Sequence, residues 1–210
     1  MIPIARLEEP RILREKKAEW TADFQASSKK RPDSSKYAHR EVTATLRSMS
    51  HEKCFYCETR EGKLSVDHYI EVAERRDLAF EWTNLYLACG ECQNKMPNTS
   101  IPAAKCVDPC ETGVEPAAHI GFKHDRAVPL SERGDCTVRK YRLNERLLAL
   151  QRARQLLLFT DVVEHLDKSQ IREERKALST EELAKLRSFA APHEPFSLMF
   201  STLLKSKGLL

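Results

Sequence analysis

The stretch from residue 54 to residue 95, CFYCETREGKLSVDHYIEVAERRDLAFEWTNLYLACGECQNK, decides how this chain folds. It opens with Cys54-x-x-Cys57 and closes with Cys89-x-x-Cys92. Each pair can present two thiolates from one tight turn, so the two pairs together suit a tetrahedral four-cysteine zinc site. Residues 58–88 separate the pairs, which is more than the shortest zinc ribbons contain, and we expect further structure inside this loop. The simpler alternative is a purely structural zinc site that takes no part in catalysis.

The composition is that of a soluble globular protein from a reducing compartment. The 210 residues, 41% hydrophobic and 31% charged, suffice for one domain or a compact module with helical additions. No apolar run approaches the about 20 residues of a membrane-spanning helix, and residues 1–10 lack a secretory segment. Seven cysteines without an export signal argue against disulfides and for a cytoplasmic location.

The overall charge allows several kinds of partner. A net charge of +4 and a pI of about 8.6 permit a phosphate-rich partner. Nucleic-acid-binding domains usually show a pI above about 9 with clustered charge, so the charge alone does not demand one. The run Lys29-Lys30-Arg31 could touch a phosphate backbone, although a solvated loop over residues 27–35 is the simpler interpretation.

The pattern predicts an α+β protein that is mainly helical, in four segments. These are an N-terminal helical, partner-docking segment (1–50), a core with the zinc site (51–100), a loop-rich extension (101–140) and a C-terminal helical region (141–210). Helical periodicity marks residues 39–49 and the chain from residue 141 onward, and Ser179 to Glu182 predicts a capping box. The leucines of the C-terminal stripe are most simply core or a partner-docking surface.

Inside the loop we expect a strand, a loop, a second strand or a turn, and then a helix, gathered around one metal. Leu64-Ser65-Val66 alternates after Gly62 and predicts a short strand that ends at Asp67-His68. The polar run 93–95 predicts a short helix that ends near residue 97.

Three further cysteines lie outside this stretch. Cys106-x-x-x-Cys110 could form a second metal site with Cys136, His119 or His124. No matching pair lies nearby in the sequence, so small buried or exposed thiols are the simpler interpretation.

The order of these elements resembles the HNH endonuclease family in its four-cysteine zinc form. The matching residues are Cys54, Cys57, Asp67, His68, Asn84, Cys89, Cys92 and Gln93, with Lys95 following. The resemblance implies a small ββα-metal core flanked by N-terminal and C-terminal helices. It also implies hydrolysis of DNA phosphodiester bonds, a structural Zn²⁺ and a catalytic Mg²⁺ or Mn²⁺.

Over most of residues 1–155 the chain resembles one branch of that family, the HNH nuclease subunit of Septu-type anti-phage defence systems, also found beside some retrons. The stretches that carry this likeness are MIPI at 1–4 with Trp20, YCE at 56–58, FEWTNL at 80–85, Asp108-Pro109, HIGF at 119–122 and LNERL at 143–147. In that branch the nuclease works with an ATPase subunit of the ABC/SMC-like kind, which implies a hetero-oligomer. The chain itself has no GxxxxGK[ST] phosphate loop.

The chain departs from the family pattern at two positions. Glu71 stands where the family often has proline. Gln93 stands where the motif usually ends in asparagine, and Asn94 follows one place later. Either amide offers the carbonyl oxygen that a metal ligand requires, so both remain candidates.

The residue types at the site suit hydrolysis of a phosphodiester. His68 can be neutral at cellular pH and take a proton from water. Asp67 supplies a hard oxygen for Mg²⁺, and Gln93 or Asn94 would add a second. Asn84 is expected to hold the loop after Asp67-His68 by hydrogen bonds and so to orient the imidazole of His68. Neighbouring residues on a regular strand point to opposite faces, so we expect Asp67 and His68 to converge where the strand breaks.

Two other functions remain open at this point. Lys95, Arg75 and Arg76 are candidate phosphate contacts, with a solvated surface as the default for each. An Asp–His pair is more often a surface pair than a catalytic one. The alternatives are therefore a non-catalytic zinc module that binds nucleic acid or a partner, and a purely structural subunit.

Overall fold

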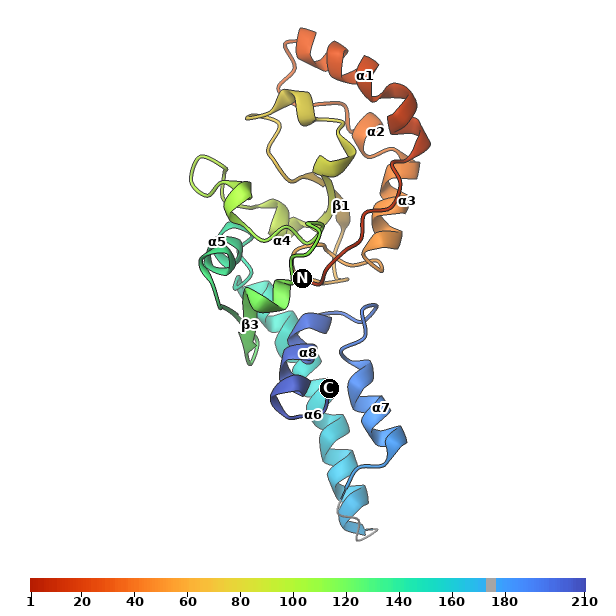
Figure 1. Cartoon of the computed structure of the whole chain (residues 1–210), viewed down its shortest axis with the longest axis vertical. Helices are drawn as coiled ribbons and strands as arrows, with labels where there is room; N and C mark the ends of the chain where they lie inside the picture. The colour runs from red at the N-terminus through yellow and green to blue at the C-terminus, as the bar shows by residue number, and fades with distance from the viewer. Residues whose placement is uncertain (173–176) are drawn as a thin grey trace.

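The computed structural model describes residues 1–172 and 177–210, and these form an elongated α+β molecule with two small sheets (Figure 1). The helices are α1 (Arg11–Ala26), α2 (Ser34–Tyr37), α3 (Arg40–Met49), α4 (Gly90–Gln93), α5 (Glu132–Lys140), α6 (Arg146–Arg172), α7 (Thr180–Ser188) and α8 (Ser197–Ser206). The strands are β1 (Leu64–His68), β2 (Leu85–Cys89), β3 (Ile120–Lys123) and β4 (Arg126–Pro129). The α+β, mainly helical class predicted from the sequence is confirmed.

The first sheet holds the predicted site. Strand β1 ends at His68 as expected and pairs antiparallel with β2, with Leu64 opposite Cys89 and His68 opposite Leu85. The chain between the strands carries two short 3-10 helices, Arg76–Leu78 and Trp82–Asn84. Because β2 runs directly into the second cysteine pair, the hairpin brings both cysteine pairs to one end of the sheet.

Helix α4 lies earlier in the chain than the sequence predicted. We expected a helix that begins at Gln93, but α4 spans Gly90–Gln93 and ends there. Cys89, with extended φ and ψ, precedes the helix, so the CxxC turn itself is helical and presents Cys92. After α4 the chain turns away, and the Met96 amide donates to the Lys140 carbonyl at 2.8 Å.

The N-terminal helices pack on the β1–β2 hairpin. The helix predicted at residues 39–49 is present as α3. Helix α3 begins after His39, whose Nδ1 accepts from the Glu41 amide at 3.3 Å. It buries the three apolar positions that set its period, Val42, Leu46 and Met49. In the predicted loop 27–35, the one-turn helix α2 begins after Asp33, whose side chain accepts from the Ser35 amide at 2.9 Å.

The prediction that residues 101–140 are loop-rich misses a hairpin and a helix. Strands β3 and β4 pair antiparallel and lead into α5, whose first turn is capped by Ser131. Gly134 in α5 lies so close to the His119 carbonyl that an added Cβ would be 1.9 Å from the oxygen. Glycine is therefore required for α5 to pack against the hairpin.

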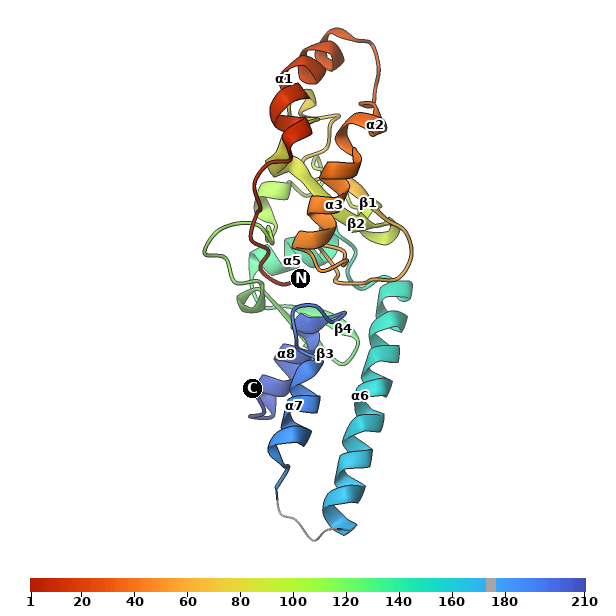
Figure 2. The same ribbon diagram turned by 90° about the vertical axis from the view of Figure 1, so that its right-hand side faces the viewer.

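The C-terminal region is helical as predicted, and the leucine stripe is divided: Leu143 and Leu166 are buried, while its middle part is exposed. Helix α6 runs beside α7 and α8 (Figure 2), and Ser179 with Glu182 forms the predicted capping box. The stripe residues Leu147, Leu150, Leu157 and Leu158 are 46%, 48%, 65% and 53% exposed. The packed face of α6 also uses Leu148, which lies outside the stripe. No helix within the described residues is long and apolar enough to span a membrane.

A buried ionic cluster joins the first cysteine pair to α8. Glu58 is 2% exposed, pairs with the Met1 ammonium and the Lys53 ammonium at 3.1 Å each, and accepts from Ser197 Oγ at 2.5 Å. Burial raises the pKa of Glu58, but the two cations and the hydroxyl outweigh it and lower the pKa to about 2. Glu58 therefore stays ionised, and because it directly follows Cys57, it links the start of α8 to the first cysteine pair.

Candidate metal centre and adjoining polar site

The four cysteines predicted to bind zinc lie together. Their Sγ atoms all lie within 4.8 Å of one another, and those of Cys57 and Cys89 are 3.6 Å apart. A tetrahedral zinc with Zn–S bonds of about 2.3 Å requires sulfur separations of about 3.8 Å. All four side chains are buried. The donor set and its spacing therefore fit one zinc ion.

Two local structures hold this arrangement. In the first pair, the Cys54 amide donates to the Thr59 carbonyl at 2.9 Å and the Glu58 amide donates to the Cys54 carbonyl at 3.0 Å. In the second pair, Cys89 ends β2 and Cys92 lies in α4. The Phe55 amide joins the two by donating to the Leu87 carbonyl at 2.9 Å. The turn and the hairpin thus fix the distance between the pairs.

The remaining cysteines do not form a second centre. Cys106 is buried, while Cys110 and Cys136 are half-buried. Within residues 1–172 and 177–210, the four-cysteine group is the only set of three or more His, Cys, Asp or Glu donors close enough to hold an ion. The sequence interpretation of these residues as small thiols agrees with this placement.

Asp67 lies on one face of β1, in contact with a lysine. Its Oδ2 accepts from Lys95 Nζ at 2.6 Å and from the Tyr56 hydroxyl at 3.2 Å. The side chains of Lys95 and Asp67 are 6% and 13% exposed, so this ion pair is largely shielded from water. Lys95 Nζ also donates to the His68 carbonyl.

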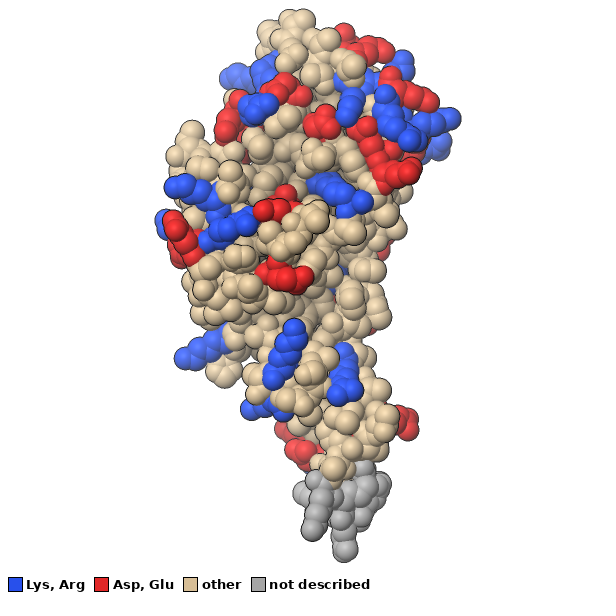
Figure 3. Space-filling view, viewed as in Figure 1, with Lys and Arg blue, Asp and Glu red and all other residues tan. Residues whose placement is uncertain are grey.

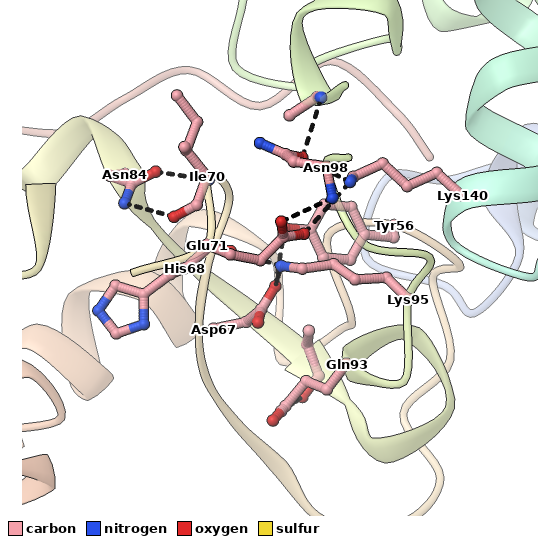
Figure 4. A network of polar contacts seen from close by, with 12 residues as sticks. Tyr56, Asp67, His68, Ile70, Glu71, Asn84, Gln93, Lys95, Asn98 and Lys140 are labelled. Carbon is pink, nitrogen blue, oxygen red and sulfur yellow. Dashed lines mark hydrogen bonds and ion pairs between the residues drawn. The ribbon is translucent and has the colours of Figure 1, made fainter. Parts of the chain in front are cut away.

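His68 points away from Asp67 (Figure 4). Its Nε2 lies 2.9 Å from the Ala79 carbonyl, and its ring lies against Tyr37 with centroids 4.8 Å apart. The expected convergence of the two side chains is therefore wrong. The reason is that β1 remains regular through His68, which still pairs with Leu85, and neighbours on a regular strand face opposite sides.

Asn84 holds the loop that follows β1. Its Oδ1 accepts from the Ile70 amide at 2.7 Å, and its Nδ2 donates to the carbonyls of Ile70 and Leu78 at 3.1 Å each. Asn84 is 4% exposed, so water cannot replace these bonds. Because the loop includes Ala79, Asn84 helps to place the carbonyl that contacts His68.

We expect Asn84→Ala to destabilise the fold by about 3 kcal/mol, because it leaves buried backbone groups without partners at about 1–3 kcal/mol each. Chemical denaturation measures this difference. The matched control is Asn94→Ala, at an exposed position, where a change within about 0.5 kcal/mol is expected. Equal stabilities of the two variants would contradict the role of Asn84 as the clamp of the loop.

Two of the residues proposed to bind Mg²⁺, Asp67 and Gln93, already make side-chain contacts within the protein, while Asn94 is exposed. The Asp67 carboxylate forms an ion pair with Lys95 and accepts a hydrogen bond from the Tyr56 hydroxyl. Gln93 Nε2 donates to Ser65 Oγ at 2.8 Å and to the Ala88 carbonyl at 2.9 Å, which anchors its amide against the hairpin. Gln93 is thus a structural link between α4 and the strands.

The candidate phosphate contacts are placed differently from one another. Arg75 is exposed and pairs with Asp77, with Nε 2.9 Å from Oδ1. Arg76 instead lies over the Phe24 ring, 4.0 Å from its centroid, and donates to the carbonyls of Ser27 and Lys29 at the end of α1. Basic and acidic side chains are interspersed on the face shown in Figure 3. Arg75 is the most accessible of the three candidates.

Sequence reasoning missed the polar network beside the site (Figure 4). Lys140, fully buried, donates to Asn98 Oδ1 at 2.6 Å and pairs with Glu71 at 3.3 Å. Glu71 also accepts from the Asn98 amide at 2.7 Å. The available signal was Glu71 itself, a carboxylate between the apolar residues Ile70 and Val72, since a largely buried charge is usually paired. Nothing local to Lys140 indicated that it would be that partner.

No protein-family model matches this chain, and no curated protein matches it with significant similarity.

Proposed function

We propose that this chain is an endonuclease of the HNH kind, which hydrolyses DNA phosphodiester bonds with His68 as general base. The observation that carries the proposal is the contact between His68 Nε2 and the Ala79 carbonyl at 2.9 Å. A carbonyl oxygen can only accept, so Nε2 carries the proton and Nδ1 of the neutral ring has a free lone pair. Nδ1 is therefore the nitrogen that could accept a proton, and the contact with Ala79 fixes the orientation of the ring.

The opposite orientation of Asp67 suits hydrolysis at the end of β1. In an in-line displacement, the attacking water and the leaving oxygen lie on opposite sides of phosphorus. If a phosphate lay at the end of β1, the His68 imidazole would face the attacking water. The leaving oxygen would then lie on the side of β1 that carries Asp67, where a positive charge would stabilise it. Asn84 acts through the loop, as a positioning residue for His68.

The expected pH dependence follows from the environment of His68. Burial lowers the pKa of His68 below the ordinary value of 6.5, although the hydrogen bond to Ala79 opposes this shift. A base must be unprotonated to act, so cleavage should fall as the pH drops through a pKa below 6.5. The acid limb of kcat/KM for cleavage measures this value. A limb centred at or above pH 6.5 would assign the base to another group.

The direct test is a plasmid-nicking assay on the purified, zinc-loaded chain. Reactions contain Mg²⁺, Mn²⁺ or no divalent ion, because the resemblance implies that one of these ions is the catalytic cofactor. The proposal extends to a hetero-oligomer with an ABC/SMC-like ATPase in anti-phage defence, so each reaction is repeated with that subunit. The candidate docking residues for that subunit are the exposed leucines of α6, Leu147, Leu150, Leu157 and Leu158.

The second candidate is a non-catalytic zinc module that binds nucleic acid or a partner. The ion pair between Asp67 and Lys95 favours it, because the carboxylate that a catalytic metal would need is already paired with an ammonium at 2.6 Å. DNA binding without nicking under every metal condition, with and without the ATPase, would select this second function.

A further inference from the structure

We propose that the loop between α1 and α2 binds the phosphate backbone of duplex DNA through Lys29, Lys30 and Arg31. This inference rests on the proposed function, since it names the surface that would hold the substrate beside His68. Two features of the structure carry it. The loop is fixed in place on the side of the β1–β2 hairpin that carries the imidazole, and its three cations are exposed and form no ion pair within the described residues.

Arg76 fixes the first part of the loop to the chain that follows β1. Its guanidinium donates to the carbonyls of Ser27 at 3.1 Å and Lys29 at 2.8 Å, and it lies over the Phe24 ring, 4.0 Å from the centroid. The Ser27 hydroxyl accepts from the Lys29 amide at 3.4 Å. A loop that is already ordered loses less conformational entropy when it binds a partner. Arg76, a predicted phosphate contact, thus holds the backbone that carries three other cations.

The second part of the loop leads to the His68 imidazole. Helix α2 begins after Asp33 and ends at Tyr37, whose ring lies against the His68 ring with centroids 4.8 Å apart. Burial raises the pKa of Tyr37, and the positive charge of Arg31 opposes this rise, which places Arg31 near the tyrosine. Figure 2 shows the loop passing from the end of α1 to α2. A DNA backbone that reaches His68 would therefore pass close to the three cations.

The charge pattern of the loop fits a polyanion with closely spaced charges. Lys29, Lys30 and Arg31 are all exposed, and none of them forms an ion pair within residues 1–172 and 177–210. The nearest acid in the sequence, Asp33, instead accepts from the amide and the hydroxyl of Ser35 at 2.9 and 2.8 Å. Duplex DNA carries one negative charge per about 1.7 Å of its axis, so one backbone can serve all three cations.

Contacts of this kind have a measurable salt dependence. Each phosphate contact makes the plot of log K against log salt steeper by about 0.9. The loss of three contacts should therefore make the slope shallower by about 2.7. At about 0.1 M salt we expect binding to weaken at least about tenfold, whatever the DNA sequence, because backbone contacts carry no sequence information.

The test is the binding of a fluorescent DNA duplex to the zinc-loaded chain, without added Mg²⁺ or Mn²⁺, over a range of salt concentrations. The loop variant replaces the three cations with glutamine: Lys29→Gln, Lys30→Gln and Arg31→Gln. The control variant removes the same charge from three exposed positions of the C-terminal region: Lys185→Gln, Lys205→Gln and Lys207→Gln. The loop variant should show the weaker binding and the shallower slope, and the control should match the wild type. Equal affinities and slopes for the two variants overturn the inference.

A second measurement uses the wild type alone. Acylation of lysines is followed by mass spectrometry with and without the duplex. DNA should slow the reaction of Lys29 and Lys30 and leave that of Lys205 and Lys207 unchanged. Unchanged rates at Lys29 and Lys30 overturn the inference, as does equal protection by polyglutamate at the same charge concentration.

These readouts separate the binding surface from the nuclease, because neither depends on cleavage. A chain that binds DNA through the loop but never nicks it refutes the nuclease alone. A chain that nicks DNA although the loop variant binds like the wild type refutes the binding surface alone.

Discussion

Cys92→Ser is expected to abolish stoichiometric zinc binding and to unfold the region around the β1–β2 hairpin. Structural zinc sites contribute about 10–16 kcal/mol of apparent binding free energy to folding, whereas a whole domain is stable by about 5–15 kcal/mol. The loss of one buried ligand therefore removes a term as large as the total. Zinc content by elemental analysis and amide hydrogen exchange of residues 54–95 measure the two effects.

The matched control for the zinc prediction is Cys136→Ser. Cys136 is half-buried and lies outside the four-cysteine group, so this variant should retain zinc and lose little stability. Treatment of the wild type with a strong chelator under reducing conditions should reproduce Cys92→Ser. Full zinc content in Cys92→Ser would show that the four thiolates do not hold the ion.

His68→Ala is expected to lower the rate of DNA nicking by about 10²–10⁴-fold, the usual contribution of a positioned general base. The side chain that remains cannot accept a proton from water. Zinc content and thermal unfolding should change little, because the imidazole makes one hydrogen bond and one ring contact. Single-turnover nicking rates for wild type and variant, at equal zinc content, measure the effect.

His165→Ala is the control for His68→Ala, since His165 is exposed on α6, away from the hairpin. It should nick DNA at the wild-type rate. Wild-type activity in His68→Ala would remove His68 from the mechanism. Loss of zinc in the same variant would mean that the residue has a structural role, and any loss of nicking would then say nothing about base catalysis.

Local signals predicted most of the fold around the metal centre. The two CxxC pairs placed four thiolates, and alternation after Gly62 gave the strand that ends at His68. The capping box at Ser179 and the helical period of α3 were equally local. The strand, the capping box and the helical period depend on residues a few positions apart, where backbone geometry decides which side chains meet. The two CxxC pairs are far apart in the sequence, and the chemistry of a four-thiolate zinc site predicted that they meet.

The pairings within the site could not be predicted in the same way. Lys95 meets Asp67, and Lys140 meets Glu71, only because α4 and α5 pack against the end of the hairpin. The hairpin formed by β3 and β4 was missed because its strands are short and lie in a proline-rich stretch. The leucines of α6 recur with a helical period, but the period alone does not predict which face of the helix packs against the rest of the protein.

The strict alternation of β1 limits how the length of this chain can vary. One residue inserted between Leu64 and Asp67 would turn the carboxylate to the imidazole face and the imidazole to the carboxylate face, while the cysteines at the base kept their places. The same insertion in the exposed turn 60–63 would leave both orientations unchanged. Natural or engineered insertions should therefore be accepted at that turn and excluded from the strand.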